Sequence, residues 1–324
     1  MEFFLHAFPL PGESTRLAVE AEADGWDGLL LADSQNLQAE VFVELALAVR
    51  ATERLLLGTG VTNPVTRHPA VVAGAAATLQ AESNGRIVLG VGRGDSSVTF
   101  IGQRPTPPGV LAAFVRRLQA YLRGESVDAD GFASRLEWLR SDVPKVPVDV
   151  TCTGSATIAA AAPVADMVSL SVGAEVERLR WGVETARAAG ARRLAAYVIA
   201  AAHPDVRVAR ELVRANVGIF AHFARGSLDR LDPSDRVVVQ EVTRAYDTER
   251  HAQSASRQTS VVPDDFVDRF AIVGPAGRCV ERLHAVEALG IERVVVVGAA
   301  KDADPQEAEA ARRGFATEVL PALR

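Results

Sequence analysis

Eight short apolar runs recur along the 324-residue chain, and amphipathic helical segments separate them. The runs are apolar on both sides, as strands are when both faces of a parallel sheet are covered. The expected strands are Phe3–Phe8, Gly28–Ala32, Leu55–Gly60, Ile87–Val91, Val146–Cys152, Met167–Val172, Leu194–Ala201 and Arg293–Gly298. Their alternation with helices predicts an α/β fold, a (β/α)8 TIM barrel, with a doubly wound parallel sheet as the alternative.

Seven helices are expected between these strands, and turn residues mark several of their ends. Pro69 stands near a helix start, and Gly25 and Gly190 follow helix ends. The expected helices are Glu13–Ala23, Ala39–Thr52, Pro69–Glu82, Gly109–Arg123, Ser155–Pro163, Glu175–Ala189 and Pro275–Leu289.

The connection between the seventh and eighth strands is too long for one helix. It contains a helix over Asp205–Ala224, a second over Pro233–His251 and the polar stretch QSASRQTSVVPDD. Long insertions in barrels lie on the loops, where they form lids or interfaces. We therefore expect a single domain over residues 1–324 that carries its largest insertion at about 202–263.

Charge and cysteine content exclude several classes of protein. The formal net charge is −6 and no basic stripe is present, so no nucleic-acid partner is expected. Cys152 and Cys279 lack the spacing of metal ligands, so no metal site is expected either. The first residues do not form a secretory signal, and the longest apolar runs have only the length of strands. A cytoplasmic location without membrane attachment is therefore expected.

The reactive groups of a barrel lie in the loops that follow the C-terminal ends of the strands. His6 ends the first expected strand, and Asp33 and Ser34 follow the second. The next three ends carry longer segments, GTGVTNPVTRHP over 58–69, GRIVLGVGRGDS over 85–96 and TCTGSAT over 151–157. These segments contain the candidate functional residues.

Each segment has an ordinary structural reading beside its functional one. Gly58 and Gly60 allow a bulge or a close approach of the backbone to a ligand. GVGRGDS is a phosphate-binding loop or a tight turn, but it does not fit a dinucleotide fingerprint because the next helix is delayed past Pro108. TCTGSAT leads into a helix start that could bind phosphate, or Thr153 or Ser155 could simply cap that helix.

Together, the segments over 58–69 and 85–96 resemble the methylene-tetrahydromethanopterin reductase group of the luciferase-like family, whose members use the deazaflavin coenzyme F420. Three further segments agree with this resemblance: WDGLLLADSQ, VPVDVTCTGSATIAAAAPVADMV and FAIVGPAGRCVERLHAVEALGIERVVVVG. The resemblance extends from the first expected strand to the eighth, so it concerns nearly the whole chain.

The resemblance implies a site for the cofactor. It implies a non-proline cis peptide at Gly60-Val61 whose bulge supports the deazaflavin ring, and it implies that the loop over 151–157 holds the phosphodiester. The cofactor-binding residues expected on this basis are Asp33, Gly60, Val61, Thr62, Asn63, Gly92, Arg93, Thr151, Thr153, Gly154 and Ser155. His6 and Ser34 are expected to contact the substrate.

The resemblance also assigns catalytic roles to Asp33 and Asp95. Many relatives have histidine where this chain has Ser34, so the histidine proton donor of the sugar-phosphate dehydrogenase relatives is missing. We expect both carboxylates to reach one cavity, where their mutual repulsion raises at least one pKa and makes that acid the proton donor. The structural alternative is that Asp95 caps a turn and Asp33 is a surface residue.

The resulting functional hypothesis is an F420-dependent oxidoreductase that transfers a hydride between the deazaflavin C5 and a small organic substrate with a C=N, C=C or C=O bond. The alternatives are an FMN-dependent luciferase-like monooxygenase and a ligand-binding barrel without chemistry. A homodimer is expected because related barrels pair through helical faces, and the apolar helix over Glu40–Val49 could supply one.

Overall fold

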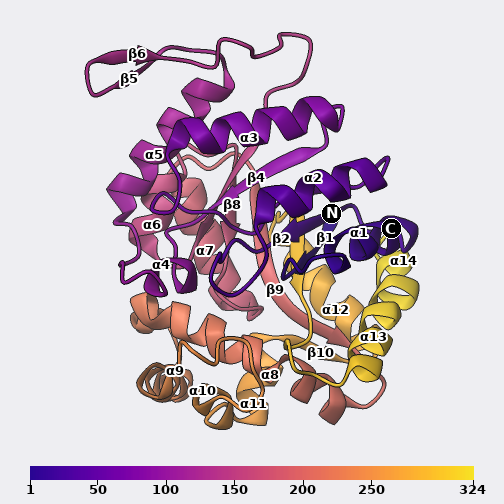
Figure 1. Cartoon of the computed structure of the whole chain (residues 1–324). Helices are drawn as coiled ribbons and strands as arrows, with labels where there is room; N and C mark the ends of the chain where they lie inside the picture. The colour runs from indigo at the N-terminus through magenta and orange to yellow at the C-terminus, as the bar shows by residue number, and fades with distance from the viewer.

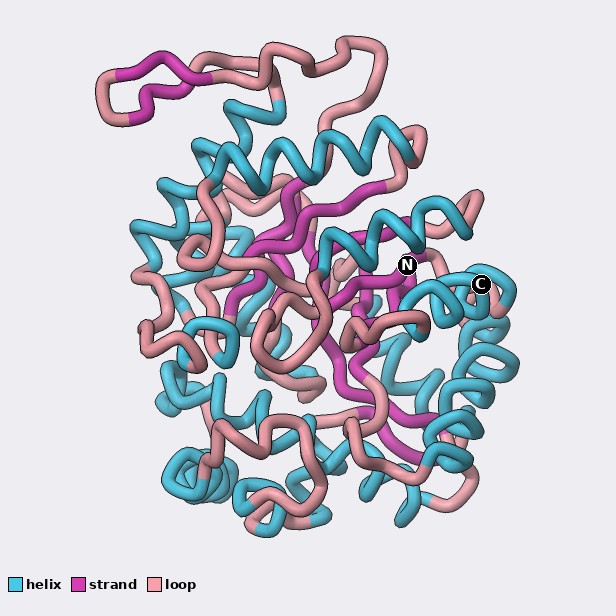
Figure 2. The backbone as a smooth tube through the Cα atoms, viewed as in Figure 1, coloured by secondary structure: helices cyan, strands magenta, loops and turns pink.

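A computed structural model of the full chain shows a closed ring of eight parallel strands surrounded by helices (Figures 1 and 2). The ring consists of β1 (Glu2–Ala7), β2 (Gly28–Leu31), β3 (Leu56–Thr59), β4 (Ile87–Val91), β7 (Val148–Cys152), β8 (Met167–Leu170), β9 (Leu194–Ala202) and β11 (Arg293–Val297). It closes because β9 pairs with both β8 and β11, and β11 pairs with β1. The predicted TIM barrel is confirmed, and the doubly wound alternative is wrong.

All seven predicted helices are present, with ends within two residues of those expected. They are α1 (Glu13–Ala23), α2 (Val41–Ala51), α3 (Pro69–Glu82), α5 (Pro108–Leu122), α6 (Ser155–Ala161), α7 (Val176–Ala188) and α12 (Ala276–Glu287). At the start of α3 the His68 imidazole accepts a hydrogen bond from the Ala70 N–H at 3.2 Å. His68 is therefore a helix cap, in the manner of other N-cap side chains.

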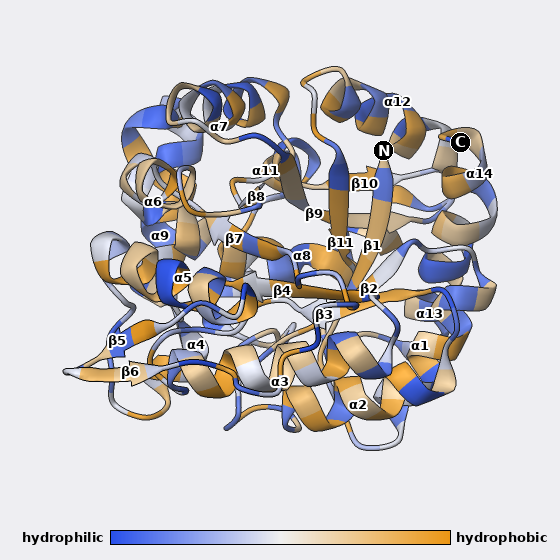
Figure 3. Cartoon of the chain, turned by 90° about the horizontal axis from the view of Figure 1, so that it is seen from above, coloured by the Kyte–Doolittle hydropathy of each residue, from blue (hydrophilic) through white to orange (hydrophobic).

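The core follows the two-residue alternation of side chains along each strand. On β1, Phe3 and Leu5 pack against the outer helices, whereas Phe4 points into the ring. Inside the ring Phe4 joins buried side chains from other strands, including Leu30 and Tyr197, and this inner cluster continues into the insertion after β9. Figure 3, coloured by hydropathy, shows the central strands as predominantly hydrophobic. The interior is thus a packed core, above which a cavity opens at one end.

The insertion between β9 and β11 contains more structure than expected. It consists of α8 (Val206–Phe223), η1 (Ala224–Arg230), α9 (Pro233–Ala245), α10 (Arg257–Ser260), α11 (Asp264–Phe270) and the short strand β10 (Ile272–Gly274), which pairs with the end of β9. The second predicted helix was too long, because α9 ends at Ala245 rather than His251. The residues that follow α9 form a loop, in which Ala252 has a φ of 63°.

The remaining elements lie outside the ring. The helix α4 (Ser96–Thr99) follows β4, and a two-stranded hairpin of β5 (Val127–Ala129) and β6 (Phe132–Ser134) projects from the body of the molecule (Figure 1). The chain ends in α13 (Pro305–Gly314), η2 (Phe315–Val319) and α14 (Leu320–Ala322). None of the helices combines the length and the apolar character that crossing a membrane requires.

Candidate active site

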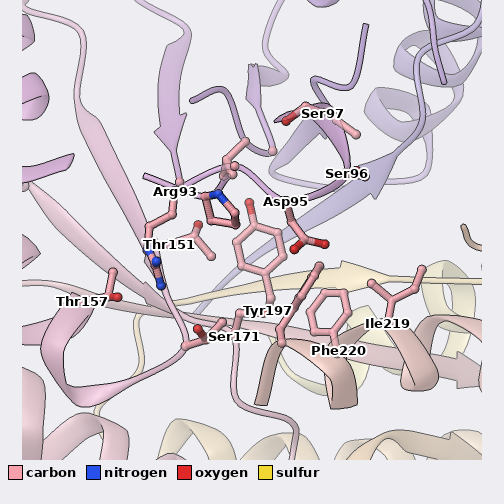
Figure 4. Close-up of a pocket in the computed structure, with 18 of the residues that line it drawn as sticks. Arg93, Asp95, Ser96, Ser97, Thr151, Thr157, Ser171, Tyr197, Ile219 and Phe220 are labelled. Carbon is pink, nitrogen blue, oxygen red and sulfur yellow. The ribbon is translucent and has the colours of Figure 1, made fainter. Parts of the chain in front are cut away.

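A cavity of about 510 Å³ opens at the C-terminal ends of the barrel strands. Of the residues predicted from the sequence, those that line it are His6, Asp33, Ser34, Gly60, Val61, Gly92, Arg93, Asp95, Thr151, Thr153, Gly154 and Ser155. The sequence analysis missed the other side of the cavity, which includes Tyr197 on β9 and a group of side chains from the insertion. Figure 4 shows Arg93 and Asp95 on either side of Tyr197, with Phe220 and Ile219 below Asp95.

The floor of the cavity is formed by the end of β1 and the turn after β3. The Gly60–Val61 peptide bond is cis. Nε2 of His6 lies 2.8 Å from the Gly60 carbonyl oxygen, and burial lowers the pKa of His6, so a neutral imidazole donates this hydrogen bond. A Cβ at Gly60 would lie 2.9 Å from the His6 ring and from Leu30. Only glycine lets this backbone turn fit against the imidazole.

Thr62 and Asn63 do not line the cavity but are buried beside it. The backbone of Thr62 forms two hydrogen bonds with β4 and the residue that follows it. The Thr62 N–H donates to the Gly90 carbonyl at 3.0 Å, and the Thr62 carbonyl accepts from the Gly92 N–H at 2.8 Å. The Asn63 side chain accepts a hydrogen bond from Val65 N–H at 3.0 Å and donates one to Ser97 at 3.2 Å. These two residues hold the surrounding loops in place rather than facing a ligand.

Asp33 forms a buried ion pair that the sequence analysis did not anticipate. Its side chain is 1% exposed, and its carboxylate contacts the Arg67 guanidinium. Arg67 also reaches Glu40, at 2.6 Å between Nη2 and Oε1. The negative charge of Asp33 is therefore compensated, and Asp33 is not the surface residue of the alternative reading.

Asp95 lies just before α4 and has only a distant cationic partner. Its loop contacts the loop of Asp33 through a hydrogen bond of 3.1 Å between the Ser34 and Ser96 hydroxyls. Oδ1 of Asp95 is 3.7 Å from Nη2 of Arg225, which belongs to η1 of the insertion. Burial raises the pKa of Asp95, and the guanidinium groups of Arg225 and Arg93 offset part of this effect. The raised pKa agrees with our expectation, but its cause is burial and not repulsion by Asp33.

The loop from Thr153 to Ser155 presents hydrogen-bond donors to the cavity. Gly154 is the N-cap of α6 and no side chain caps this helix, so the N–H groups of Ser155 and Ala156 have no acceptor in the chain. Arg93 supplies a nearby positive charge, and the Thr106 carbonyl holds its Nε at 2.6 Å. In Figure 4 the Arg93 side chain extends toward Thr157. Unpaired N–H groups beside a guanidinium suit an anionic group such as a phosphodiester.

The remaining wall comes from α8 of the insertion and is largely apolar. Asn216, Ile219, Phe220 and Phe223 line the cavity, and their spacing of three and four residues places them on one face of α8. The loop after α9 adds His251. The spacing of these residues in the sequence predicts one apolar face of a helix. The spacing alone does not show whether that face lines a cavity or packs into a core.

Comparisons with known proteins agree with this geometry. The model of the luciferase-like monooxygenase family matches residues 7–293. The F420-dependent glucose-6-phosphate dehydrogenase of Beutenbergia cavernae is 31% identical over 343 aligned positions, which cover 97% of this chain and 94% of the relative. A 5,10-methylenetetrahydromethanopterin reductase of Methanolobus tindarius is 24% identical over 296 positions, which cover 85% and 86% of the two chains.

A solved structure shows the same fold. It is the coenzyme F420-dependent tetrahydromethanopterin reductase of Methanopyrus kandleri, with a TM-score of 0.76 and 23% identity over 100% of this chain and 99% of that one. The resemblance inferred from the sequence motifs is confirmed. The family model extends from the end of β1 to the start of β11, and it includes the cavity-lining segments that follow β2, β3, β4 and β7. This chain therefore belongs to the luciferase-like monooxygenase family.

Proposed function

We propose that the protein is a coenzyme F420-dependent oxidoreductase that transfers a hydride between the deazaflavin C5 and a small organic substrate. The observation that carries this proposal is the division of one cavity between an anion-binding loop at Thr153–Ser155 and a buried acid, Asp95, on another wall. Of the relatives described above, one is named an F420-dependent glucose-6-phosphate dehydrogenase and another a 5,10-methylenetetrahydromethanopterin reductase. The bound deazaflavin would supply or accept the hydride, and the protein's task is to position and to move a proton.

The residues of the chain fit such a cofactor. The turn at Gly60–Val61 and the side-chain-free Gly92 offer a flat backbone surface for a ring. The N–H groups at the start of α6, together with Arg93, would hold the phosphodiester. Thr62 and Asn63 would support this surface from behind through the hydrogen bonds described above.

On the substrate side, Asp95 would supply the proton that accompanies reduction. Its raised pKa keeps a fraction of the carboxyl protonated closer to neutral pH than an ordinary aspartate. Asp33, paired with Arg67, would act instead as a fixed charge near the ring. His6 and Ser34 also face the cavity, where they would contact the substrate.

Cofactor binding tests the proposal directly. We expect the purified protein to bind F420 in preference to FMN, as measured by fluorescence titration. Gly154→Val should abolish F420 binding, because its side chain would stand at the loop that meets the phosphodiester. A Cβ at Gly154 has its nearest contact at 3.6 Å, from the Gly226 carbonyl, so the fold should tolerate it.

Gly74→Val is the matched control, since Gly74 lies on α3 outside the cavity and a Cβ there has no neighbour within 4 Å. Equal F420 affinity in the wild type and Gly154→Val would disprove the role of the loop. Tight binding of FMN without binding of F420 would assign the protein to the FMN-dependent monooxygenases, the alternative that we consider. Binding of F420 without turnover of any substrate would favour the ligand-binding barrel.

We also propose that the protein is a homodimer in the cytoplasm. Residues 1–324 would form a single domain, with its insertion at about 202–263. Val43 and Leu47 on α2 are 57% and 50% exposed, and Val71 on the neighbouring α3 is 60% exposed. Such a group of exposed apolar side chains on adjacent helices supports a subunit interface. Light scattering should give twice the chain mass, and Leu47→Glu should give a monomer, whereas Val237→Glu, on an exposed position of α9, should not.

A further inference from the structure

The loop after α9 carries a histidine ring to the cavity, on the substrate side. His251 lines the cavity and is 8% exposed. Its Nδ1 lies 2.9 Å from the Tyr246 hydroxyl oxygen, and its Nε2 has no hydrogen-bond partner within the chain. The expected helix Pro233–His251 included this residue, whereas α9 ends at Ala245 and His251 lies in the loop that follows.

Tyr246 determines which nitrogen of His251 carries the hydrogen. The Tyr246 ring stacks on His222 with 3.8 Å between ring centroids and 12° between their planes, so the phenol is fixed. Burial raises the pKa of Tyr246, so its hydroxyl keeps its proton. His251 Nδ1 is the only hydrogen-bond partner of this hydroxyl. The phenol therefore donates to Nδ1, and the hydrogen of the ring resides on Nε2.

The surroundings keep the imidazole neutral. Burial lowers the pKa of His251 to about 4, and the nearby Lys301 ammonium contributes in the same direction. His222, on the other side of Tyr246, has its pKa lowered to about 4 by burial and by Arg225. At neutral pH His251 is thus an uncharged hydrogen-bond donor whose tautomer is set by Tyr246.

We propose that the Nε2–H of His251 donates a hydrogen bond to the oxygen or nitrogen of the substrate bond that is reduced. This inference rests on the proposed function and narrows its substrates to carbonyl compounds, imines and conjugated carbonyl compounds, because an isolated C=C bond has no acceptor atom.

The step balances without a further reactant. The substrate carbon would receive a hydride, that is, a proton and two electrons, from the reduced deazaflavin. The π electron pair would then move to the oxygen or nitrogen, directly in a carbonyl compound or imine and through the C=C bond in a conjugated carbonyl compound. Asp95 transfers a proton to that heteroatom and is later reprotonated by water. His251 keeps its hydrogen throughout, and it stabilises the negative charge that develops on the heteroatom.

The tautomer can be measured without turnover. In the F420 complex labelled with ¹⁵N-histidine, the two nitrogen shifts of His251, assigned by their loss in His251→Gln, should show a protonated Nε2 and an unprotonated Nδ1 at pH 7. Tyr246→Phe should mix the two tautomers. An unprotonated Nε2 in the wild-type complex would overturn the proposal, as would a fully charged imidazolium.

Kinetics with probe substrates test the catalytic role. Cyclohexanone, cyclohex-2-enone and 1-pyrroline represent the three substrate classes, and oxidation of reduced F420 reports the rate. Loss of one donor to a developing charge costs about 10²-fold in kcat, so this is the effect expected of His251→Leu. His251→Gln, whose amide N–H can occupy the position of Nε2, should recover part of it. F420 affinity should be unchanged in both.

His284→Gln is the control, because His284 is exposed on α12 and outside the cavity. A wild-type protein that does not bind F420 would refute the proposed function, whereas the same NMR measurement on the free protein would still decide which tautomer His251 adopts. Normal F420 binding and probe turnover with an unaffected His251→Leu would refute only the inference about His251.

Discussion

The two sides of the cavity are built differently. The side formed by β1 to β7 combines short loops that bring backbone to the cavity, at Gly60, Gly92 and Gly154, with polar side chains such as Arg93 and Asp95. The side formed by the insertion consists of side chains on α8 and on the loop after α9, such as Phe220 and His251. Backbone surfaces of this kind leave glycine-rich motifs in a sequence, whereas a wall of side chains leaves only a periodicity that any packed helix shares. We therefore propose that the first side binds the cofactor, with His6 and Ser34 also contacting the substrate, and that the insertion supplies the remaining substrate contacts.

Asp95→Asn should have the largest effect, because Asp95 is the proposed proton donor. We expect turnover to fall by about 10²-fold or more, the usual size of a general-acid effect, with F420 affinity nearly unchanged. Only the protonated carboxyl can donate, and this form predominates below its pKa. The rate of substrate reduction should therefore fall as the pH rises through the raised pKa of Asp95. A pH–rate profile that keeps this fall in Asp95→Asn would remove Asp95 from the mechanism.

Asp33→Asn should disturb the cofactor side alone. The neutral amide leaves Arg67 without its buried anionic partner, and loss of a charged hydrogen bond of this kind lowers the free energy of unfolding by about 2 kcal/mol. F420 affinity should fall as well, and chemical denaturation and fluorescence titration measure the two effects. Glu40→Gln is the matched variant, because Glu40 pairs with the same Arg67 guanidinium but its side chain is 44% exposed. It should cost less than about 1 kcal/mol. Equal losses in both variants would contradict a special role for Asp33.

Phe220→Ala should give the smallest effect and should be confined to the substrate side. Removal of this aromatic wall should raise KM about tenfold, in line with the loss of apolar contact, and should leave F420 affinity unchanged. Phe132→Ala, on the projecting hairpin where the side chain is 77% exposed, should change neither. A weakened affinity for F420 in Phe220→Ala would show that the two sides are not separate.

Much of the fold could be predicted because the eight strands are apolar on both sides and stand between well-marked helices. The hairpin β5–β6 and the short strand β10 were missed, since three-residue strands carry no measurable alternation. Within the site, the strand-end residues were identified because the topology of a barrel brings those ends together. Arg67 and Arg225 were not, because their contacts with Asp33 and Asp95 join positions that nothing in the sequence relates. Thr62 and Asn63 follow the cavity-lining Gly60 and Val61 in the chain, but they contact the loops behind the cavity.

The pairing of β9 has a consequence for how such a protein can change over time. Residues 194–199 of β9 bond to β8 and β11, and only its last residues, from Ala200 to Ala202, bond to β10 of the insertion. The ring of strands is thus complete before the insertion departs from it. The ladder hydrogen bonds of the ring therefore do not involve the residues between His203 and Ala271, although Ser227 in that stretch donates a hydrogen bond to the Thr153 carbonyl at 3.5 Å. We propose that this one continuous stretch of gene encodes a large part of substrate choice, so that its exchange between relatives would change specificity on the same ring of strands.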